Sequence, residues 1–383
     1  SFDNLKNSAM AKASNASEGM TEENQGTWDS STQTYHGGQD WKHLDNFVED
    51  FSVTTNGLGT PSEAMNAAVN ACSKIGHYPP SDFEPALSHL SHFLWNSNDH
   101  KDLLLLGNGA SELIDLVIRQ AKVGKWRPGP QQTQYKEYAR SALAAGFTTA
   151  SHDDKSASLL CLVNPTNPTG DYWPVERIKS YIVNSCDPGS TVIVDESMQP
   201  WLGPHWRDDS LIKERKWADD LSKNSNVHVW VMTSWTKIWS CTGVRLGSVV
   251  APTSDLTKLV KSKQVPWSVN VIALDFLSAA VRDAEYLNRT WKMTPKWNQE
   301  TRDEMDTNHP DWEIYGAPFL SWLWIDTKSE KVCKEVVERA KKAGVPVRSG
   351  APGYNLPTFF RMAVRPKEKR DVLMEALKPL SKQ

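Results

Sequence analysis

The stretch that decides the fold is Val229-Trp-Val-Met-Thr-Ser234-Trp-Thr236-Lys237-Ile-Trp-Ser-Cys-Thr-Gly-Val-Arg245-Leu-Gly-Ser-Val-Val250. An apolar strand leads into a turn that carries Ser234, Thr236 and Lys237, and Arg245 precedes a second short strand. Burial and cationic neighbours lower the pKa of a lysine and let it form a Schiff base with an aldehyde. A guanidinium and a hydroxyl suit a phosphate on that aldehyde. The alternative is a core strand with an incidental surface lysine.

The spacing Ser234-x-x-Lys237, with Gly243-x-Arg245-x-Gly247 downstream, resembles the pyridoxal-phosphate (PLP) site of the fold-type I, class I/II aminotransferase superfamily. The resemblance implies that Lys237 is the catalytic residue that holds the cofactor aldehyde, and that Ser234, Thr236 and Arg245 bind the cofactor phosphate. It also implies an α/β fold like that of aspartate aminotransferase. We therefore expect a three-layer PLP domain with a mostly parallel sheet and a smaller α+β domain.

Length and composition limit the classes of function. The chain has 383 residues, enough for two domains, and a net charge of -3, which argues against a nucleic-acid partner. Five scattered cysteines without Cys-x-x-Cys spacing favour neither a metal site nor a disulfide framework. No run approaches the roughly 20 apolar residues that span a bilayer. We expect a soluble, cytoplasmic protein that does not act at a membrane.

The order of the predicted elements indicates the domains. Strands at Leu159–Val163, Val192–Asp195 and Val227–Ser234 alternate with helices at Thr133–Ala145 and Val175–Asn184. This rhythm is typical of a parallel sheet covered by helices, whose ligands gather at the carboxyl ends of the strands. We predict a mobile N-terminal arm at residues 1–30, a large PLP-binding domain at residues 60–285, and a small domain assembled from residues 31–59 and 286–383.

A glycine-rich turn, Gly107-Asn-Gly109-Ala110-Ser111-Glu112, follows an apolar strand at Asp102–Leu106 and enters an amphipathic helix. Free backbone N–H groups at a helix start attract an anion. We predict that Gly109, Ala110 and Ser111 bind the cofactor phosphate. An ordinary strand-to-helix turn is the alternative.

The loop Asn164-Pro-Thr-Asn167-Pro-Thr-Gly170 is rigid, so it can hold an amide against a planar ligand. It resembles the family loop whose second asparagine, here Asn167, bonds the ring hydroxyl of PLP. Asp195 ends the next strand, where a carboxylate stays ionised against the pyridinium nitrogen. The aromatic residue that the family often carries three positions later is replaced by Met198.

Two tyrosines complete the expected cofactor site. Tyr135 resembles the aromatic residue that stacks on the cofactor ring, and the alternative is that Tyr135 and Tyr138 are core residues of a helix. Tyr78 resembles a residue that reaches across a dimer interface to the neighbour's cofactor phosphate. The resemblance therefore implies a homodimer with shared active sites.

The substrate residues indicate a branch of the superfamily. Phe359-Phe-Arg361-Met-Ala-Val-Arg365 resembles the strand whose arginine binds the substrate carboxylate. The likeness is to the branch of histidinol-phosphate aminotransferases and threonine-phosphate decarboxylases. In that branch the counterparts of six residues contact an O-phospho amino acid: His36, Gly37, Asn56, Asn167, Arg348 and Arg361. Alternatively, Arg348 forms a surface ion pair with Glu330 or Glu335.

The reaction is left open between two outcomes. Four features resemble the decarboxylases of this branch more closely: His36-Gly37-Gly38, Asp50-Phe-Ser52, Thr236 before the lysine, and Val347-Arg348. The resemblance therefore slightly favours decarboxylation of an anionic, O-phosphorylated amino acid, and the alternative is an aminotransferase of the histidinol-phosphate type. Trp201, Trp235 and Trp239 lie near the motifs and predict a diverged substrate pocket. A catalytically inactive binding protein is disfavoured by the retained lysine, and a dinucleotide-binding protein by the absence of a Gly-x-Gly-x-x-Gly motif.

Overall fold

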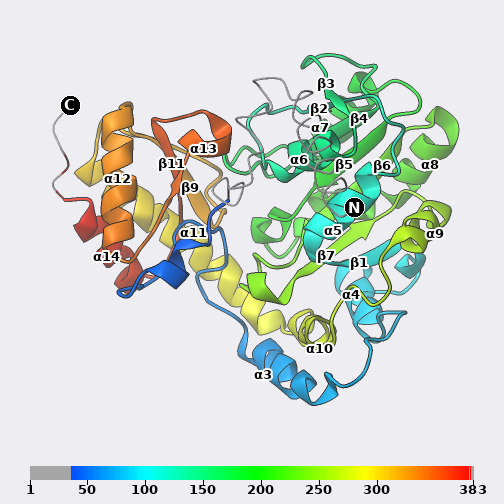
Figure 1. Ribbon diagram of the computed structural model, residues 1–383, viewed down its shortest axis with the longest axis horizontal. Coiled ribbons are helices and arrows are strands. Elements are labelled where there is room, and N and C mark those ends of the chain that lie inside the picture. Colours follow the sequence, from blue (N-terminus) through cyan, green and yellow to red (C-terminus); the bar gives the residue numbers. More distant parts are fainter. Residues whose placement is uncertain (1–35, 379, 381–383) are drawn as a thin grey trace, which may run out of the picture.

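The computed structural model describes residues 36–378 and residue 380. The predicted N-terminal arm, residues 1–30, lies outside the described residues. Two sheets form two lobes, and the larger lobe lies on the right in Figure 1. Each lobe has its own cluster of buried apolar side chains. The expected large α/β unit and smaller α+β unit are therefore both present.

The large sheet has seven strands in the order β1-β7-β6-β5-β4-β2-β3. Strand β7 is antiparallel to both of its neighbours, while the other pairs are parallel, so the prediction of a mostly parallel sheet is confirmed. Two of its central strands, Leu159–Val163 and Thr191–Asp195, are buried along their whole length, as expected where helices cover both faces of a sheet. The strands are β1 (Leu104–Asn108), β2 (Lys125–Pro128), β3 (Thr148–Thr149), β4 (Leu159–Val163), β5 (Thr191–Asp195), β6 (His228–Ser234) and β7 (Leu246–Val250).

Helices pack around this sheet, as Figure 1 shows. They are α3 (Ser62–Ala71), α4 (Ala86–Trp95), α5 (Gly109–Ile118), α6 (Glu137–Ala144), α7 (Val175–Ser185), α8 (Arg215–Ser225), α9 (Ser254–Lys263) and α10 (Val271–Ala280). The helix predicted from Thr133 begins only at Glu137, which leaves Tyr135 in the loop before it. Short 3-10 turns are η2 (Asp40–His43), η3 (Cys72–Lys74), η4 (Lys101–Leu103), η5 (Gln199–Leu202), η6 (Trp206–Asp209), η7 (Leu211–Lys213) and η8 (Thr242–Val244).

The small sheet is antiparallel, in the order β10-β11-β9-β8. Its strands are β8 (Glu313–Tyr315), β9 (Trp322–Asp326), β10 (Arg348–Ser349) and β11 (Phe359–Ala363), and its helices are α12 (Glu330–Lys342), α13 (Ala351–Tyr354) and α14 (Lys367–Ala376). Strand β10 is short, because only Arg348 and Ser349 pair with β11.

Helix α11 (Ala284–Asn308) connects the two lobes and is yellow in Figure 1. Its first turns place Tyr286 and Leu287 in the core of the large lobe. Further along, Trp297 and Met305 lie in the core of the small lobe. We propose that the two domains divide along this helix.

Side-chain caps explain where several helices begin. Thr253, Asn270, Asp283 and Ser329 each precede a helix, and each side chain accepts a hydrogen bond from the backbone N–H three residues later. Such a cap satisfies one of the free N–H groups of the first turn. The local sequence therefore determines these helix starts without help from distant residues.

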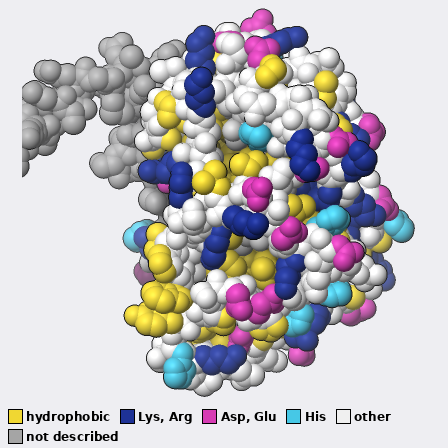
Figure 2. Space-filling view, turned by 90° about the vertical axis from the view of Figure 1, so that its right-hand side faces the viewer, with side chains coloured by type: hydrophobic (Ala, Val, Ile, Leu, Met, Phe, Trp, Pro, Cys, Tyr) yellow, Lys and Arg dark blue, Asp and Glu magenta, His cyan; other side chains and the backbone are white. Residues whose placement is uncertain are grey.

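The surface of the large lobe mixes charges of both signs. Figure 2 shows basic and acidic side chains interspersed on the face that carries α8, where Lys216 pairs with Asp220 and Lys223 with Asp219. Within the described part of the chain, no helix is long and apolar enough to cross a membrane. The same residues hold no cluster of three His, Cys, Asp or Glu side chains placed for a metal ion.

Candidate active site

Two adjoining cavities lie at the carboxyl ends of the central strands, and Tyr135, Asn167 and Lys237 line both. We call the first the cofactor cavity. It is lined by Ala110, Ser111, Tyr135, Val163, Pro165, Asn167, Asp195, Ser197, Met198, Ser234, Thr236, Lys237 and Arg245. We call the second the substrate cavity. It is lined by His36, Gly37, Val53, Thr54, Tyr135, Asn167, Lys237, Arg348, Tyr354 and Arg361.

Lys237 follows the end of β6 and reaches the boundary of the two cavities. Burial, followed by the positive charges of Arg361 and Arg245, lowers the pKa of its amine from 10.5 to about 8. A lysine with such a pKa has an appreciable neutral fraction at physiological pH. The amine can therefore act as a nucleophile toward an aldehyde or as a base.

The start of α5 forms an anion cradle with the turn after β6. The Arg245 Nη2 donates to Ser111 Oγ at 3.1 Å, and the hydroxyls of Ser234 and Thr236 share a hydrogen bond of 2.8 Å. Gly109 has a φ of +75°, and a Cβ there would lie 2.4 Å from Arg245 Nη2. Only glycine lets the guanidinium approach the helix start this closely. The cradle therefore suits a phosphate group.

Asp195 ends β5 on the floor of the cofactor cavity. Its Oδ1 accepts from the backbone N–H of Ser197 at 2.9 Å, and its Oδ2 accepts from the Tyr138 hydroxyl at 2.8 Å. Burial raises the pKa of Asp195, and these hydrogen bonds only partly offset the effect. A protonated ring nitrogen would supply the positive charge that the buried carboxylate needs. The residues of the cavity therefore fit PLP.

Tyr138 is a functional residue that the sequence did not single out. The motif predicted that Tyr135 stacks on the cofactor ring. It gave Tyr138 no role other than that of a possible core residue in the same helix. In the structure Tyr135 lines both cavities from the loop, and Tyr138 is fully buried in α6 with its hydroxyl on Asp195. The only signal was its position three residues after Tyr135, which is one helical turn away.

Met198 occupies the place of the usual family aromatic and lines the cofactor cavity. Its side chain cannot donate a hydrogen bond. Asn167 remains near this region, and its Oδ1 accepts from Arg361 Nη1 at 2.5 Å. The asparagine thus contacts the cofactor cavity and also orients an arginine of the substrate cavity.

Arg348 and Arg361 stand opposite each other on β10 and β11. Directly paired residues project from the same face of a sheet, so both guanidinium groups reach the substrate cavity. Arg361 also donates to the Ser52 carbonyl at 2.7 Å. The alternative that Arg348 forms a surface ion pair is wrong, because its side chain is buried and donates to the carbonyls of Ser349 and Pro352.

His36 enters the substrate cavity next to the two arginines. Burial, and then the charges of Arg348 and Arg361, lower its pKa to about 4. The imidazole is therefore neutral at pH 7 and offers hydrogen bonding without charge. Gly37 follows it, and a Cβ on this residue would lie 2.4 Å from the Ser52 carbonyl oxygen, so a side chain would push this segment out of the cavity.

Asn56 does not occupy the predicted substrate position. Its Nδ2 donates to the carbonyl of Ile238 at 3.0 Å and to Thr290 Oγ1 at 2.7 Å, and its backbone N–H donates to the carbonyl of Lys237. The amide is therefore used inside the protein to hold the lysine turn. The structure does not bring this side chain into the substrate cavity, and the sequence motif alone does not show which way a side chain points.

Tyr78 lies outside the two cavities on the surface. Its side chain is 77% exposed and stacks on Trp267, with ring centroids 4.3 Å apart. In one chain it cannot supply the cofactor contact that the resemblance implies. Its exposure leaves it available to a second chain.

The tryptophans near the motifs do not line the substrate cavity, so they give no support to the prediction of a diverged substrate pocket. Trp201, Trp235 and Trp239 are almost fully buried in the core of the large lobe. Trp235 and Trp239 stack at 5.1 Å, and Trp235 Nε1 donates to Ser248 Oγ. These rings belong to the core of the large lobe and line neither cavity.

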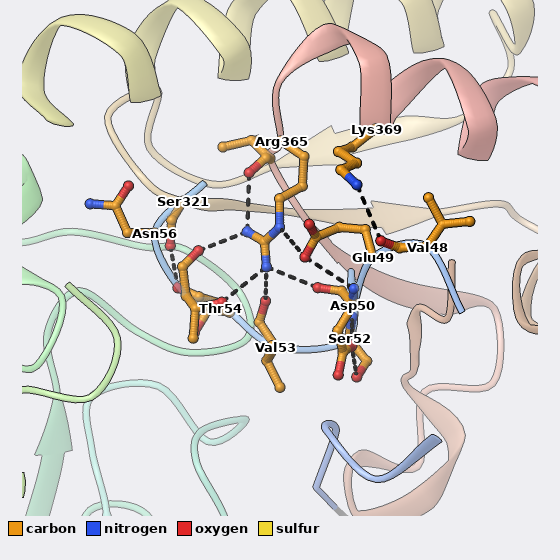
Figure 3. A network of polar contacts seen from close by, with 12 residues as sticks. Val48, Glu49, Asp50, Ser52, Val53, Thr54, Asn56, Ser321, Arg365 and Lys369 are labelled. Carbon is orange, nitrogen blue, oxygen red and sulfur yellow. Dashed lines mark hydrogen bonds and ion pairs between the residues drawn. The ribbon is translucent and has the colours of Figure 1, made fainter. Parts of the chain in front are cut away.

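The N-terminal segment, residues 49–55, is held against the small lobe by Arg365, as Figure 3 shows. This arginine is only 2% exposed. The segment contributes Val53 and Thr54 to the substrate cavity and the Ser52 carbonyl to Arg361. Arg365 donates to six acceptors: Glu49 Oε1, Asp50 O, Val53 O, Thr55 O, Thr55 Oγ1 and Val364 O.

A second hydrogen-bond network fixes residues 36–38, the segment that carries His36. Ser52 Oγ donates to Asp50 Oδ1 at 2.6 Å and accepts from the backbone N–H of Gly38 at 2.8 Å. The carboxylate, the hydroxyl and the glycine amide thus form one chain of hydrogen bonds. These bonds therefore join the segment of residues 36–38 to the segment of residues 49–55.

A lowered-pKa lysine, an anion cradle and a buried carboxylate at the carboxyl ends of a mostly parallel sheet define a PLP-dependent enzyme of fold type I. The chain belongs to the family described as aminotransferase class I and II, whose family model matches residues 48–377. Its relatives include both aminotransferases and decarboxylases, so the chain is a PLP-dependent enzyme of one of these two types.

The chain is 27% identical over 256 residues to histidinol-phosphate aminotransferase 1 of Cupriavidus pinatubonensis, spanning 61% of this chain and 63% of that protein. It is 27% identical over 355 residues to threonine-phosphate decarboxylase of Salmonella typhimurium, spanning 86% of this chain and 90% of that protein. Among solved structures it is similar to the histidinol-phosphate aminotransferase of Clostridium acetobutylicum, with a TM-score of 0.73, 20% identity and coverage of 86% and 98%.

Proposed function

We propose that this enzyme decarboxylates an O-phosphorylated amino acid. The observation that supports the substrate class is the pair Arg348 and Arg361, whose guanidinium groups face one cavity beside Lys237. Arginine matches the planar arrangement of oxygens in carboxylates and phosphates. One arginine binds the α-carboxylate and the other lies beside the phosphate. The relatives named for phosphorylated substrates support this assignment.

The roles of the two arginines follow from their surroundings. Arg361 is tied to Asn167, which also lines the cofactor cavity, so it lies nearer to the reacting carbon and binds the carboxylate. Arg348 lies one strand further out and faces the distal group. The neutral imidazole of His36 adds a hydrogen bond between them.

When bound, PLP supplies the chemistry of an electron sink for the pair released from the substrate Cα. The protein decides which bond is released by holding it perpendicular to the cofactor plane. In decarboxylation the bond from Cα to the carboxylate carbon breaks, CO₂ leaves, and Lys237 Nζ returns a proton to Cα. Asp195 stays ionised to hold the ring nitrogen in its protonated form.

Transamination is the second candidate. Its support is the lowered pKa of Lys237, because an amine with a pKa of about 8 can take the proton from Cα and move it to the cofactor carbon. The histidinol-phosphate aminotransferases among the relatives support it as well. Both reactions use the same two arginines.

The deciding experiment mixes the PLP-loaded enzyme with O-phospho-L-threonine and, separately, with L-glutamate. Release of CO₂ from the phosphorylated amino acid, without a keto acid product, supports the proposal. A keto acid from glutamate without gas release would refute it and establish an aminotransferase. Silence with both compounds would refute the substrate class while leaving the cofactor assignment intact.

The active unit is a homodimer in this proposal. Its support is the exposed stack of Tyr78 on Trp267, together with the resemblance that places Tyr78 at the neighbour's cofactor phosphate. Sedimentation of the purified enzyme tests it. A monomer with full activity would overturn the assignment, and Tyr78→Ala should weaken cofactor retention without changing the fold.

A further inference from the structure

One face of the small sheet carries Trp322, Trp324 and Arg361. Arg361 pairs directly with Trp324, and Trp322 lies two residues earlier on β9, so the three side chains project from the same face. Leu323 and Ile325 point the other way, into the core of the small lobe. Trp322, in contrast, is fully buried among the apolar side chains of the large lobe. This tryptophan therefore crosses the boundary between the two lobes.

The indole of Trp322 reaches the loop of residues 164–170, which carries Asn167. Its Nε1 donates to the carbonyl of Pro168 at 2.8 Å. Close to this contact, the backbone N–H of Ala317, between β8 and β9, donates to the carbonyl at position 170 at 2.9 Å. The second half of the loop is thus held by the segment that forms the small sheet.

The first half of the same loop is anchored to the large lobe. The backbone N–H of Asn164 donates to the carbonyl of Asp195 at 2.9 Å, and Thr166 Oγ1 donates to the carbonyl of Val163 at 2.8 Å. Asn167 lies where the two halves of the loop meet. The position of its side chain therefore depends on both lobes.

The amide of Asn167 is oriented by Arg361. A guanidinium has only donors, so the atom of Asn167 that accepts from Arg361 Nη1 at 2.5 Å is the amide oxygen. The two N–H donors of the amide are then left for a ligand in the cofactor cavity, which Asn167 also lines. Pro168 is the next residue in the chain, so a shift of its carbonyl changes the distance and angle of that hydrogen bond.

We propose that Trp322 is a positioning residue, which holds Asn167 within hydrogen-bonding distance of the cofactor ring hydroxyl through the Pro168 carbonyl. The position of the small lobe is thereby coupled to the cofactor. The inference rests on the proposal that Asn167 bonds the ring hydroxyl, and it is the same for decarboxylation and for transamination. A hydrogen bond from Asn167 favours the ionised form of the ring oxygen.

The test follows the binding and the absorbance of PLP, not turnover. Trp322→Phe keeps an aromatic ring at the lobe boundary and removes the N–H donor. It should weaken PLP binding by about threefold in equilibrium dialysis, because one hydrogen bond is partly lost. It should also move the pH midpoint of the visible absorbance of bound PLP to a higher value. Benzothienylalanine at position 322, which replaces the N–H by sulfur in a ring of the same shape, should have the same effect without disturbing the packing.

Trp206→Phe is the matched control. Trp206 is also deeply buried, and its Nε1 has no hydrogen-bond partner among the residues that the structure describes. This variant should leave the PLP affinity and the absorbance midpoint unchanged. An equal effect of Trp206→Phe and Trp322→Phe would overturn the proposal, because lost packing would then explain both.

A double-mutant cycle with Asn167→Ala separates the role of Trp322 from that of Asn167. Asn167→Ala should shift the absorbance midpoint, and Trp322→Phe should add no further shift in this background. A full additional shift would overturn the positioning role. No shift from Asn167→Ala alone would overturn the contact of Asn167 with the ring, and the inference with it. The urea unfolding midpoint of each cofactor-free variant checks that it is folded.

Discussion

Arg365→Lys should destabilise the protein by about 3 kcal/mol. The guanidinium of Arg365 donates to six acceptors (Figure 3). Five lie on the segment of residues 49–55, and the sixth is the carbonyl of Val364. A lysine ammonium has three N–H donors, so at least three of these contacts would be lost. Each buried acceptor left without a donor costs about 1 kcal/mol or more. The loss would be measured as the difference in urea unfolding midpoint multiplied by the slope of the transition.

The same variant should also disturb the substrate cavity. The segment that Arg365 holds presents the Ser52 carbonyl to Arg361. We therefore expect KM to rise more than kcat falls, because the carboxylate site is displaced while Lys237 is not.

Arg119→Lys is the control for the stability measurement, because Arg119 is exposed and pairs only within its own helix turn with Asp115. The charge is kept in both variants, so the difference between them reports the geometry of the donors. A destabilisation of Arg365→Lys equal to that of Arg119→Lys would show that the six contacts do not hold the segment, and the reasoning would fail.

Three further predictions concern the cofactor cavity. Tyr138→Phe removes a hydrogen bond that lowers the pKa of Asp195, so the acidic limb of the pH–rate profile should move to higher pH; an unmoved limb would contradict this role. Lys237→Met should remove activity. It should also change how the stability of the cofactor-free protein depends on pH. The amine of Lys237 has a pKa of about 8 in the folded protein and 10.5 ordinarily, so the unfolded chain binds more protons between these two pH values. Stability of the wild type relative to Lys237→Met should therefore rise from about pH 8 to pH 10.5, which unfolding at pH 7, 8, 9 and 10 would check. Arg245→Lys should weaken PLP binding by about tenfold, because the bidentate contact of the guanidinium with a phosphate is lost; equilibrium dialysis measures the affinity, and equal retention would exclude Arg245 from the phosphate site.

The cofactor residues could be found from the sequence because each of them lies at the end of a strand. Gly109, Asn167, Asp195 and Lys237 follow β1, β4, β5 and β6, and strands of this kind are recognisable as short apolar runs bounded by turns. Parallel strands end at one edge of the sheet, so residues that are far apart in the chain meet there. Knowledge of the strands was therefore enough to bring the cofactor site together.

The substrate cavity was only partly predictable. Arg361 and Arg348 were expected and are found there, since both belong to the strand pair of the small sheet. Asn56 was expected and points elsewhere, and Tyr354 was not expected at all. A motif specifies the type of residue, but the direction of a side chain depends on the packing around it.

The sequence by itself determined the strands, the glycine turn and the helix starts with their caps, because backbone preference and apolar pattern act over a few neighbouring residues. The motifs that end these strands also supplied, through the family resemblance, the residues proposed to hold PLP. Only the tertiary structure decided that Tyr138 supports Asp195, that Arg365 holds the N-terminal segment, and that Lys136 and Arg348 both lie near the Tyr354 ring. These contacts join residues from different elements. Arg365 and the segment that it holds are about 310 residues apart in the chain, and Lys136 and Arg348 come from different lobes. Their geometry follows from how the lobes pack on α11, which no local pattern contains.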